Sequence, residues 1–382
     1  MMKKLLGLSL VVLLLDLSIF KEGSVINYTE AAEATKLVFT KQGPVRGRRI
    51  DVRPELGLGK VDAFIGLPYS SPPTGQFRFM PPTSPQSWSP RVREAVKQPP
   101  VCPQVIPDLS DKNKALRYMT VGRYNYLTNL FKHLQDQNED CLYLNIYTPS
   151  HSAFTDNGGR YGSEDYLSSG LPVLVFIHGE SYEWNSGNPY DGSVLASYAN
   201  LVVVTLNYRL GVLGFLRPGL DRNVVSNFGL LDQIAALHWL QENVGAFGGN
   251  PDAVTLVGHG TGASLVSFLM TSPVAKAGSK DLFQKAILMS GSSLSPMSVC
   301  KDPKDITLQV TRGLNCSTEN SRMLTDVAIS RCLKEAPLSD LLKIKLNVPM
   351  YTTPFGPIVD GVVIPDKPLD ILSQKGHSQY FH

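Results

Sequence analysis

The amino-acid sequence predicts an α/β fold in which a central, mostly parallel sheet is flanked by helices. Two observations point to it: short apolar runs without polar alternation, typical of strands buried on both faces, and an apolar segment of helical periodicity between them. The composition agrees, because 382 residues that are 43% hydrophobic and 18% charged suffice for a large core. We therefore expect one α/β domain over residues 30–382.

The first residues predict a secretory signal peptide, which we place at residues 1–24. Two lysines follow the initial methionines, and an apolar run covers residues 5–15 until Asp16 interrupts it. Such a run has the length of a signal-peptide core and is too short to span a bilayer. We expect the mature protein to enter the secretory pathway and lose this segment.

Four apolar runs are the predicted parallel strands: residues 174–177, 201–206, 254–257 and 286–289. Before the third run, apolar residues recur at helical spacing, namely Leu230, Leu231, Ile234, Leu237, Trp239 and Leu240. A second helix is expected at residues 263–270, directly after the third run. Strands and helices thus alternate along the chain, as they do in α/β domains.

Residues 254–262 have the outline of a strand, a sharp turn and a helix, with Gly258, Gly260 and Gly262 in the turn. In the G-x-S-x-G elbow of α/β-hydrolases, the central serine is a nucleophile exposed above the sheet. Gly260 stands at that position, so the turn keeps its shape without a nucleophile. Glycine-rich turns of this kind also bind phosphates, so the turn alone does not distinguish a hydrolase elbow from a phosphate-binding loop. The neighbouring motifs distinguish these two interpretations.

Four further segments carry a resemblance to the type B carboxylesterase and cholinesterase family, in order and spacing: residues 139–147, 174–179, 201–215 and 247–254. Within that family the chain most resembles the neuroligins, through residues 79–82, 100–103, 191–198 and the elbow without serine at 258–263. The resemblance implies the α/β-hydrolase fold. It also implies that the domain continues past His382, so we expect the fold to be incomplete at its C-terminus.

A second part of the catalytic machinery is also altered. An acyl-transfer enzyme needs backbone N–H donors for the oxyanion, often from a His-Gly-Gly-Gly loop. This chain has His178 followed by Gly179, Glu180 and Ser181. Glu180 and Ser181 replace glycines, and a carboxylate that pointed inward would repel an oxyanion.

Another side chain could take the place of the missing serine, and the sequence offers Thr261, His259 and the serine turn at residues 290–293. Thr261 lies one residue past the apex and is expected to start the helix, with its hydroxyl directed away from the serine position. His259 is expected to be a turn or packing residue, because a base without a nucleophile has no acyl group to transfer. The serines follow a strand and are expected to form a strand-end turn. We therefore predict no catalytic residue.

The five cysteines are interpreted in an oxidising compartment, which favours disulfides. The family resemblance implies one bridge between Cys102 and Cys141 and another between Cys316 and Cys332. Three possibilities stay open for Cys300: a free thiol, a partner beyond residue 382, or exchange with Cys316. Asn27 and Asn315 begin N-x-S/T tripeptides and are candidate glycosylation sites.

Residues 103–138, inside the first cysteine loop, mix aromatic and basic residues and are expected outside the core. Two interpretations stay open for this segment. It covers the vacated site or offers a protein-binding surface, or it is a helical insertion packed on its own domain.

The net charge of +3 gives no case for nucleic-acid binding, since no basic stripe or zinc spacing appears. No Cys-x-x-Cys pair or histidine cluster predicts a metal, and we expect no cofactor. The neuroligin resemblance implies an inactive adhesion protein at synapses or cell contacts, which binds neurexins in a calcium-dependent complex and forms a homodimer when complete. Two competing hypotheses are a carboxylesterase with unusual machinery and an inert esterase-like module that aids secretion or dimerisation.

Overall fold

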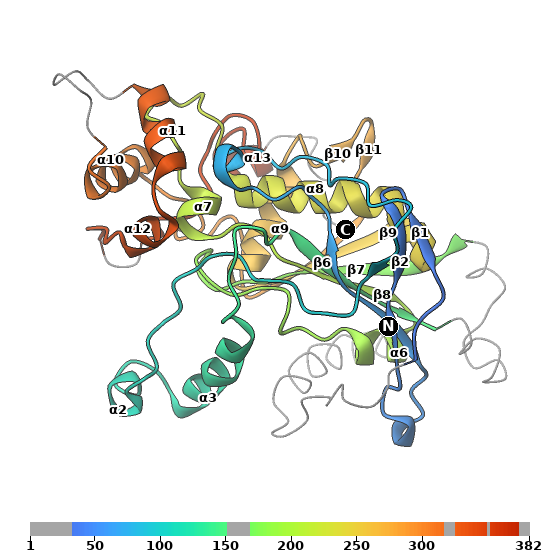
Figure 1. The fold of residues 1–382 in the computed structure, drawn as a ribbon. Coiled ribbons are helices and arrows are strands. Elements are labelled where there is room, and N and C mark those ends of the chain that lie inside the picture. Colours follow the sequence, from blue (N-terminus) through green and yellow to red (C-terminus); the bar gives the residue numbers. More distant parts are fainter. Residues whose placement is uncertain (1–32, 151–168, 317–324, 350–351, 374–382) are drawn as a thin grey trace.

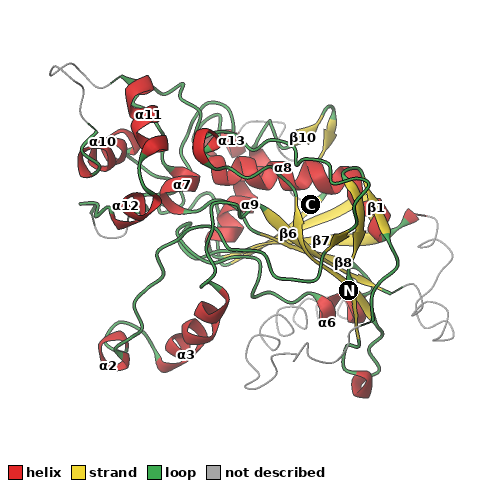
Figure 2. Ribbon diagram, in the orientation of Figure 1, coloured by secondary structure: helices red, strands yellow, loops and turns green. Residues whose placement is uncertain are grey.

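The computed structural model describes residues 33–150, 169–316, 325–349 and 352–373. Its centre is a seven-stranded sheet with helices on both faces (Figures 1 and 2). The expected signal peptide at residues 1–24 and the candidate glycosylation site Asn27 lie outside the described residues. In the described part, no helix is long and apolar enough to cross a membrane.

The sheet has the strand order β12-β9-β7-β8-β6-β4-β3. The strands are β3 (Arg48–Ile50), β4 (Val61–Pro68), β6 (Tyr143–Pro149), β7 (Leu171–Ile177), β8 (Val202–Leu206), β9 (Gly249–His259) and β12 (Lys285–Met289). Neighbours among β12, β9, β7 and β8 pair in parallel, and these are the four strands that the sequence predicts. The α/β class is confirmed. The sheet is mixed, because β6, β4 and β3 extend it by antiparallel pairing.

Helices cover the two faces of the sheet. On one face, α8 (Phe228–Asn243) and α9 (Thr261–Thr271) pack with Val202, Val204 and Leu206 of β8 in the largest hydrophobic cluster. On the other, α6 (Ser193–Ala199) packs against Val203. Successive side chains of a strand point to opposite faces, so the unbroken apolar run of β8 fills two cores. The two helices predicted from the sequence are α8 and α9.

Outside residues 103–138, the remaining elements surround this sheet. They are β1 (Val38–Thr40), β2 (Gly43–Arg46), β5 (Arg93–Glu94), β10 (Lys276–Ala277), β11 (Lys280–Asp281), η1 (Pro54–Leu56), η2 (Gly75–Phe77), η4 (Val244–Phe247), α7 (Gly211–Phe215), α10 (Pro303–Gly313), α11 (Asp326–Glu335), α12 (Leu338–Lys343) and α13 (Pro368–Ser373). Helices α7, α10, α11 and α12, at the upper left of Figure 1, contribute to a second hydrophobic cluster.

Arg78 links this helical group to the N-terminal part of the chain. Its side chain is 9% exposed and forms two hydrogen bonds with the carboxylate of Glu139, at 2.6 and 2.7 Å. The same guanidinium donates to the carbonyls of Leu333 and Ala336, at the end of α11. One buried charge is therefore satisfied by groups from two distant parts of the chain.

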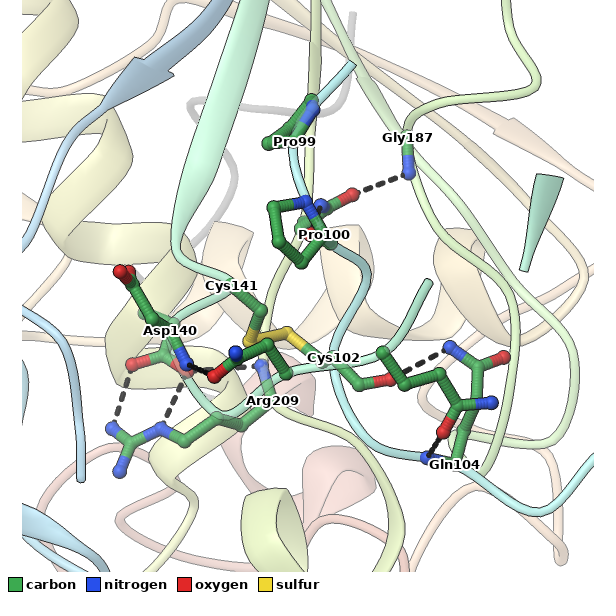
Figure 3. The surroundings of a disulfide bond; sticks show 12 residues. Pro99, Pro100, Cys102, Gln104, Asp140, Cys141, Gly187 and Arg209 are labelled. Carbon is green, nitrogen blue, oxygen red and sulfur yellow. Dashed lines mark hydrogen bonds and ion pairs between the residues drawn. A yellow bond between two sulfur atoms is a disulfide. The ribbon is translucent and has the colours of Figure 1, made fainter. Parts of the chain in front are cut away.

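Two disulfides close local loops. The Cys102–Cys141 bridge has a Cα–Cα distance of 5.0 Å, and Figure 3 shows it between the side chains of Arg209 and Gln104. The Cys316–Cys332 bridge has a Cα–Cα distance of 5.9 Å. Cys300 is a buried free thiol among the described residues, and burial raises its pKa to about 11. Exchange with Cys316 therefore does not occur in this structure.

The loop closed by Cys102 and Cys141 contains a helical insertion. Its elements are α2 (Lys112–Ala115), α3 (Val121–Leu130) and η3 (Phe131–His133), at the lower left of Figure 1. It has a small core of its own, formed by Val101, Leu127, Leu130, Phe131, Leu134 and Trp184. Of these, Trp184 comes from the segment after β7, so the insertion packs on its own domain through this residue.

Candidate functional site

The elbow lies between the last residue of β9 and the first residue of α9. Gly260, at its apex, has φ 58° and ψ −122°, a combination that L-residues adopt only under strain. Its N–H donates to the carbonyl of Met289 at 2.9 Å. A Cβ atom built on Gly260 would meet no atom within 4 Å. The backbone of a nucleophile elbow is therefore present, with open space at the position of the side chain.

The flanking glycines are packed tightly. A Cβ on Gly258 would collide with the carbonyl of Gly262, and a Cβ on Gly262 would collide with the carbonyl of Ile177. Strand β9, helix α9 and strand β7 thus approach one another at distances that only glycine permits. The elbow keeps its strand-to-helix packing although its apex carries no reactive group.

The loop after β7 is the structural counterpart of an oxyanion loop. Gly179 lies against the elbow, because a Cβ there would collide with the carbonyl of His259. The next three residues have positive φ: Glu180 at 102°, Ser181 at 57° and Tyr182 at 63°. Glycine adopts such angles freely, whereas other residues need support from their surroundings. We call residues 179–185 the former oxyanion loop.

The backbone N–H of Glu180 is already occupied. It donates to the hydroxyl oxygen Oγ1 of Thr261 at 3.1 Å. In α/β-hydrolases an N–H from this loop and the N–H of the residue after the nucleophile bind the oxyanion. Thr261 is the first residue of α9, as the sequence predicts. Its hydroxyl accepts the hydrogen bond of the N–H that the loop would otherwise offer to an oxyanion.

The sequence left the direction of the Glu180 carboxylate open, and in the structure this carboxylate is paired with Arg123. It accepts two hydrogen bonds from Arg123, at 2.6 Å to Nη2 and 3.0 Å to Nη1. Burial would lower the pKa of Arg123, but the hydrogen bonds and charge of Glu180 outweigh burial and raise it. The negative charge of Glu180 is thus compensated by the guanidinium of Arg123.

His178 precedes this loop and is fully buried. Its ring stacks on Tyr208 with centroids 4.3 Å apart, and the Tyr208 hydroxyl donates to the His178 carbonyl at 2.6 Å. Burial lowers the pKa of His178 to about 3, so the ring is neutral at physiological pH. His178 is therefore held as a packing residue by its contacts with Tyr208.

His259 and the serine turn do not replace the missing serine. His259 is exposed at the end of β9. In the serine turn, Ser293 is 3% exposed and its hydroxyl lies 2.8 Å from that of Ser267, while the Ser292 carbonyl accepts from Ser264. The structure therefore does not join any of these groups to a base and an oxyanion site.

Asn315, the second candidate glycosylation site, is exposed and has φ 54°, two residues after the end of α10. Asparagine tolerates this left-handed conformation better than most residues. The third residue of its tripeptide, Ser317, lies outside the described residues. In the parts of the chain that the structure describes, no group of three or more His, Cys, Asp or Glu side chains could hold a metal ion.

Two residues that sequence reasoning missed support the former oxyanion loop. Arg123 compensates Glu180, and Asn185 has φ 106° and donates from its side chain to the Gly179 carbonyl at 3.0 Å. Arg123 gives no signal in the sequence, because 57 positions separate it from Glu180. For Asn185, the general tolerance of asparagine for positive φ was the one available hint.

Comparison with known proteins agrees with this geometry. Residues 34–381 match the carboxylesterase family. The chain is 41% identical to mouse Neuroligin-3 over 348 residues, 42% identical to mouse Neuroligin-2 over 355 and 39% identical to Neuroligin-1 of Caenorhabditis elegans over 337. These alignments cover 89%, 90% and 87% of the chain, which spans 40% of the length of each relative. Neuroligins are thus homologues of this protein, and the chain belongs to the carboxylesterase family.

Proposed function

We propose that the chain forms the N-terminal part of a catalytically inactive, cholinesterase-like ectodomain that acts in cell adhesion, as in neuroligins. The observation that carries the proposal is the combined state of the two catalytic elements. Gly260 supplies no nucleophile, and the Glu180 amide is bonded to Thr261 rather than open to an oxyanion. A fold that keeps its shape without its chemistry fits a binding role better than an enzymatic one.

The proposed partner is a neurexin-like receptor, bound in a calcium-dependent complex, and the complete protein is proposed to be a homodimer at the cell surface of synapses or other contacts. Homology to neuroligins supports this proposal. The chain spans 40% of the length of these relatives, and we assign no receptor-contact residue within it.

The partner proposal is tested with the complete protein that contains this chain. Binding of a soluble neurexin ectodomain is measured by surface plasmon resonance, once with calcium and once with a chelator. We expect binding that the chelator abolishes. No binding in either condition would contradict the adhesion proposal and favour an inert module that aids secretion or dimerisation.

The absence of catalysis is tested with a short-chain nitrophenyl ester. We expect no hydrolysis above the rate in buffer for the natural protein and for Gly260→Ser, since the serine alone restores no oxyanion donor. Hydrolysis by the natural protein that Thr261→Ala or His259→Ala abolishes would instead establish a carboxylesterase with unusual machinery.

A further inference from the structure

The former oxyanion loop contacts the helical insertion at several points. These contacts join residues 179–185, after β7, to residues 103–138, inside the Cys102–Cys141 loop. They comprise an ion pair, two hydrogen bonds and an aromatic pair, and each lies within the described residues. A loop that serves transition-state stabilisation in an enzyme therefore has a different set of partners in this protein.

The ion pair is the strongest of these contacts. The Arg123 guanidinium and the Glu180 carboxylate form two parallel hydrogen bonds, and their side chains are 39% and 20% exposed. The guanidinium also lies over two aromatic rings, 5.1 Å from the centroid of Tyr126 and 5.9 Å from that of Trp184. Bidentate geometry and partial burial distinguish this pair from a solvated surface salt bridge.

Neutral contacts surround the ion pair. Gln104 and Asn185 exchange two hydrogen bonds: the Asn185 N–H donates to Oε1 of Gln104 at 2.7 Å, and Nε2 of Gln104 donates to the Asn185 carbonyl at 3.0 Å. Phe131 packs edge-on against Trp184 with centroids 5.7 Å apart. Both Gln104 and Asn185 are buried, so their polar groups depend on each other.

The backbone of Glu180 gives a second, independent observation. Its φ of 102° is unfavourable for a residue with a Cβ, and glycine would adopt it without strain. The carboxylate of this residue is bonded to Arg123, 57 positions earlier in the chain. A strained residue persists where its surroundings determine its position, and Glu180 is held at its amide by Thr261 and at its carboxylate by Arg123.

We propose that the former oxyanion loop is the anchor of the helical insertion and that Glu180 is its positioning residue, which holds α3 against the body of the domain through Arg123. The site lost for catalysis has thereby become a fixed attachment point. The anchor determines where the outer face of the insertion stands relative to the sheet.

The experiment measures hydrogen exchange of α3 in the natural protein, in Glu180→Gln and in Arg123→Gln. Both variants remove the charge pair and leave a polar side chain in place. We expect exchange of the α3 amides to rise about tenfold in each, because hydrogen bonds between charged groups contribute more than neutral ones. Exchange in α8, on the sheet itself, should stay unchanged.

A matched control is Glu94→Gln, which removes the ion pair between Arg46 and Glu94. That pair, with an N–O distance of 3.1 Å and side chains 39% and 53% exposed, joins two strands outside the insertion. It should leave α3 exchange as in the natural protein. Arg123→Lys keeps the charge without the bidentate fork, and its α3 exchange should fall between those of the natural protein and Arg123→Gln.

Unchanged α3 exchange in both Glu180→Gln and Arg123→Gln would overturn the proposal. So would an equal rise in α3 and α8, since the variants would then loosen the whole domain rather than the insertion. Limited trypsin digestion gives a second readout, because cleavage after the exposed Arg117 should be faster in both variants and unchanged in Glu94→Gln.

Discussion

The elbow and the former oxyanion loop depart from the pattern of a catalytic site in different ways. At the elbow the reactive side chain is absent, while the backbone angles of Gly260 and the packing of Gly258 and Gly262 remain those of a strand-to-helix elbow. In the loop, glycine positions carry larger residues, and Glu180 has acquired partners at both its amide and its carboxylate. The elbow thus lacks only a reactive side chain, whereas the loop carries larger residues that contact other parts of the protein.

A side chain at the elbow would be easier to restore than an open amide in the loop. A single substitution can return a hydroxyl to the elbow, because the space for it is open. The amide of Glu180 would have to give up its bond to Thr261 before it could bind an oxyanion, and the side chain at this position is held separately by Arg123. The following predictions test two points. The first is whether the elbow is tightly packed at Gly262 and open at Gly260, and the second is whether the backbone of the loop is strained at Glu180.

The largest effect is expected from Gly262→Ala, which brings a Cβ against the Ile177 carbonyl. Because backbone must move to accept it, we expect a loss of about 3 kcal/mol in the free energy of unfolding, measured in urea. Gly122→Ala is the matched control, since a Cβ there meets nothing within 4 Å, and its stability should not fall. A small loss in Gly262→Ala would show that the elbow packing is loose.

The next effect concerns the pH dependence of stability. Burial lowers the pKa of His178 from 6.5 to about 3. Between these two pH values the ring is protonated in the unfolded chain and neutral in the folded protein. Stability is therefore complete above pH 6.5 and falls as the pH drops toward 3. Between pH 6.5 and about pH 5 we expect a loss of about 2 kcal/mol, seen as a lower urea midpoint.

The loss should shrink in His178→Phe, whose ring can stack on Tyr208 without titrating. The exposed His238 is the control, and His238→Gln should keep the pH dependence of the natural protein. An unaltered pH profile in His178→Phe would mean that other groups dominate acid destabilisation.

Gly260→Ser is expected to fold with a moderate loss. Its Cβ has room, and the cost arises from the positive φ of 58°, which we expect to contribute about 1–2 kcal/mol. Gly278→Ser offers a comparison, because Gly278 also has positive φ, 64°, and open space around a built Cβ. If Gly260→Ser loses far more in urea unfolding than Gly278→Ser, the space at the elbow is not accessible.

The smallest effect is the difference in stability between two substitutions of Glu180. It separates the strain of the backbone from the loss of the ion pair with Arg123. Alanine and glycine both remove the carboxylate, but glycine alone relieves the φ of 102°. We expect Glu180→Gly to be about 1 kcal/mol more stable than Glu180→Ala in urea unfolding. Equal stabilities would indicate that this backbone conformation carries no strain.

The sequence predicted the parts of this molecule that depend on local pattern. Apolar runs predicted the four parallel strands, and glycine spacing predicted a turn at residues 258–262. Periodicity did not predict the antiparallel strands β3, β4 and β6, because their pairing depends on contacts between distant segments. The partner of Glu180 was not predictable for the same reason, since the direction of its carboxylate depends on Arg123 in an insertion that no local pattern places.

The hydrogen bonds of Arg78 to residues at the end of α11 have a consequence for biosynthesis. Its guanidinium is satisfied partly by the carbonyls of Leu333 and Ala336, so 255 further positions must be synthesised after Arg78 before the first of those acceptors exists. At the usual rate of translation this delay is on the order of ten to fifty seconds. During that time Arg78 can pair with Glu139 but lacks its acceptors at the end of α11. The contact between Arg78 and the end of α11 is therefore a late event in the synthesis of this chain.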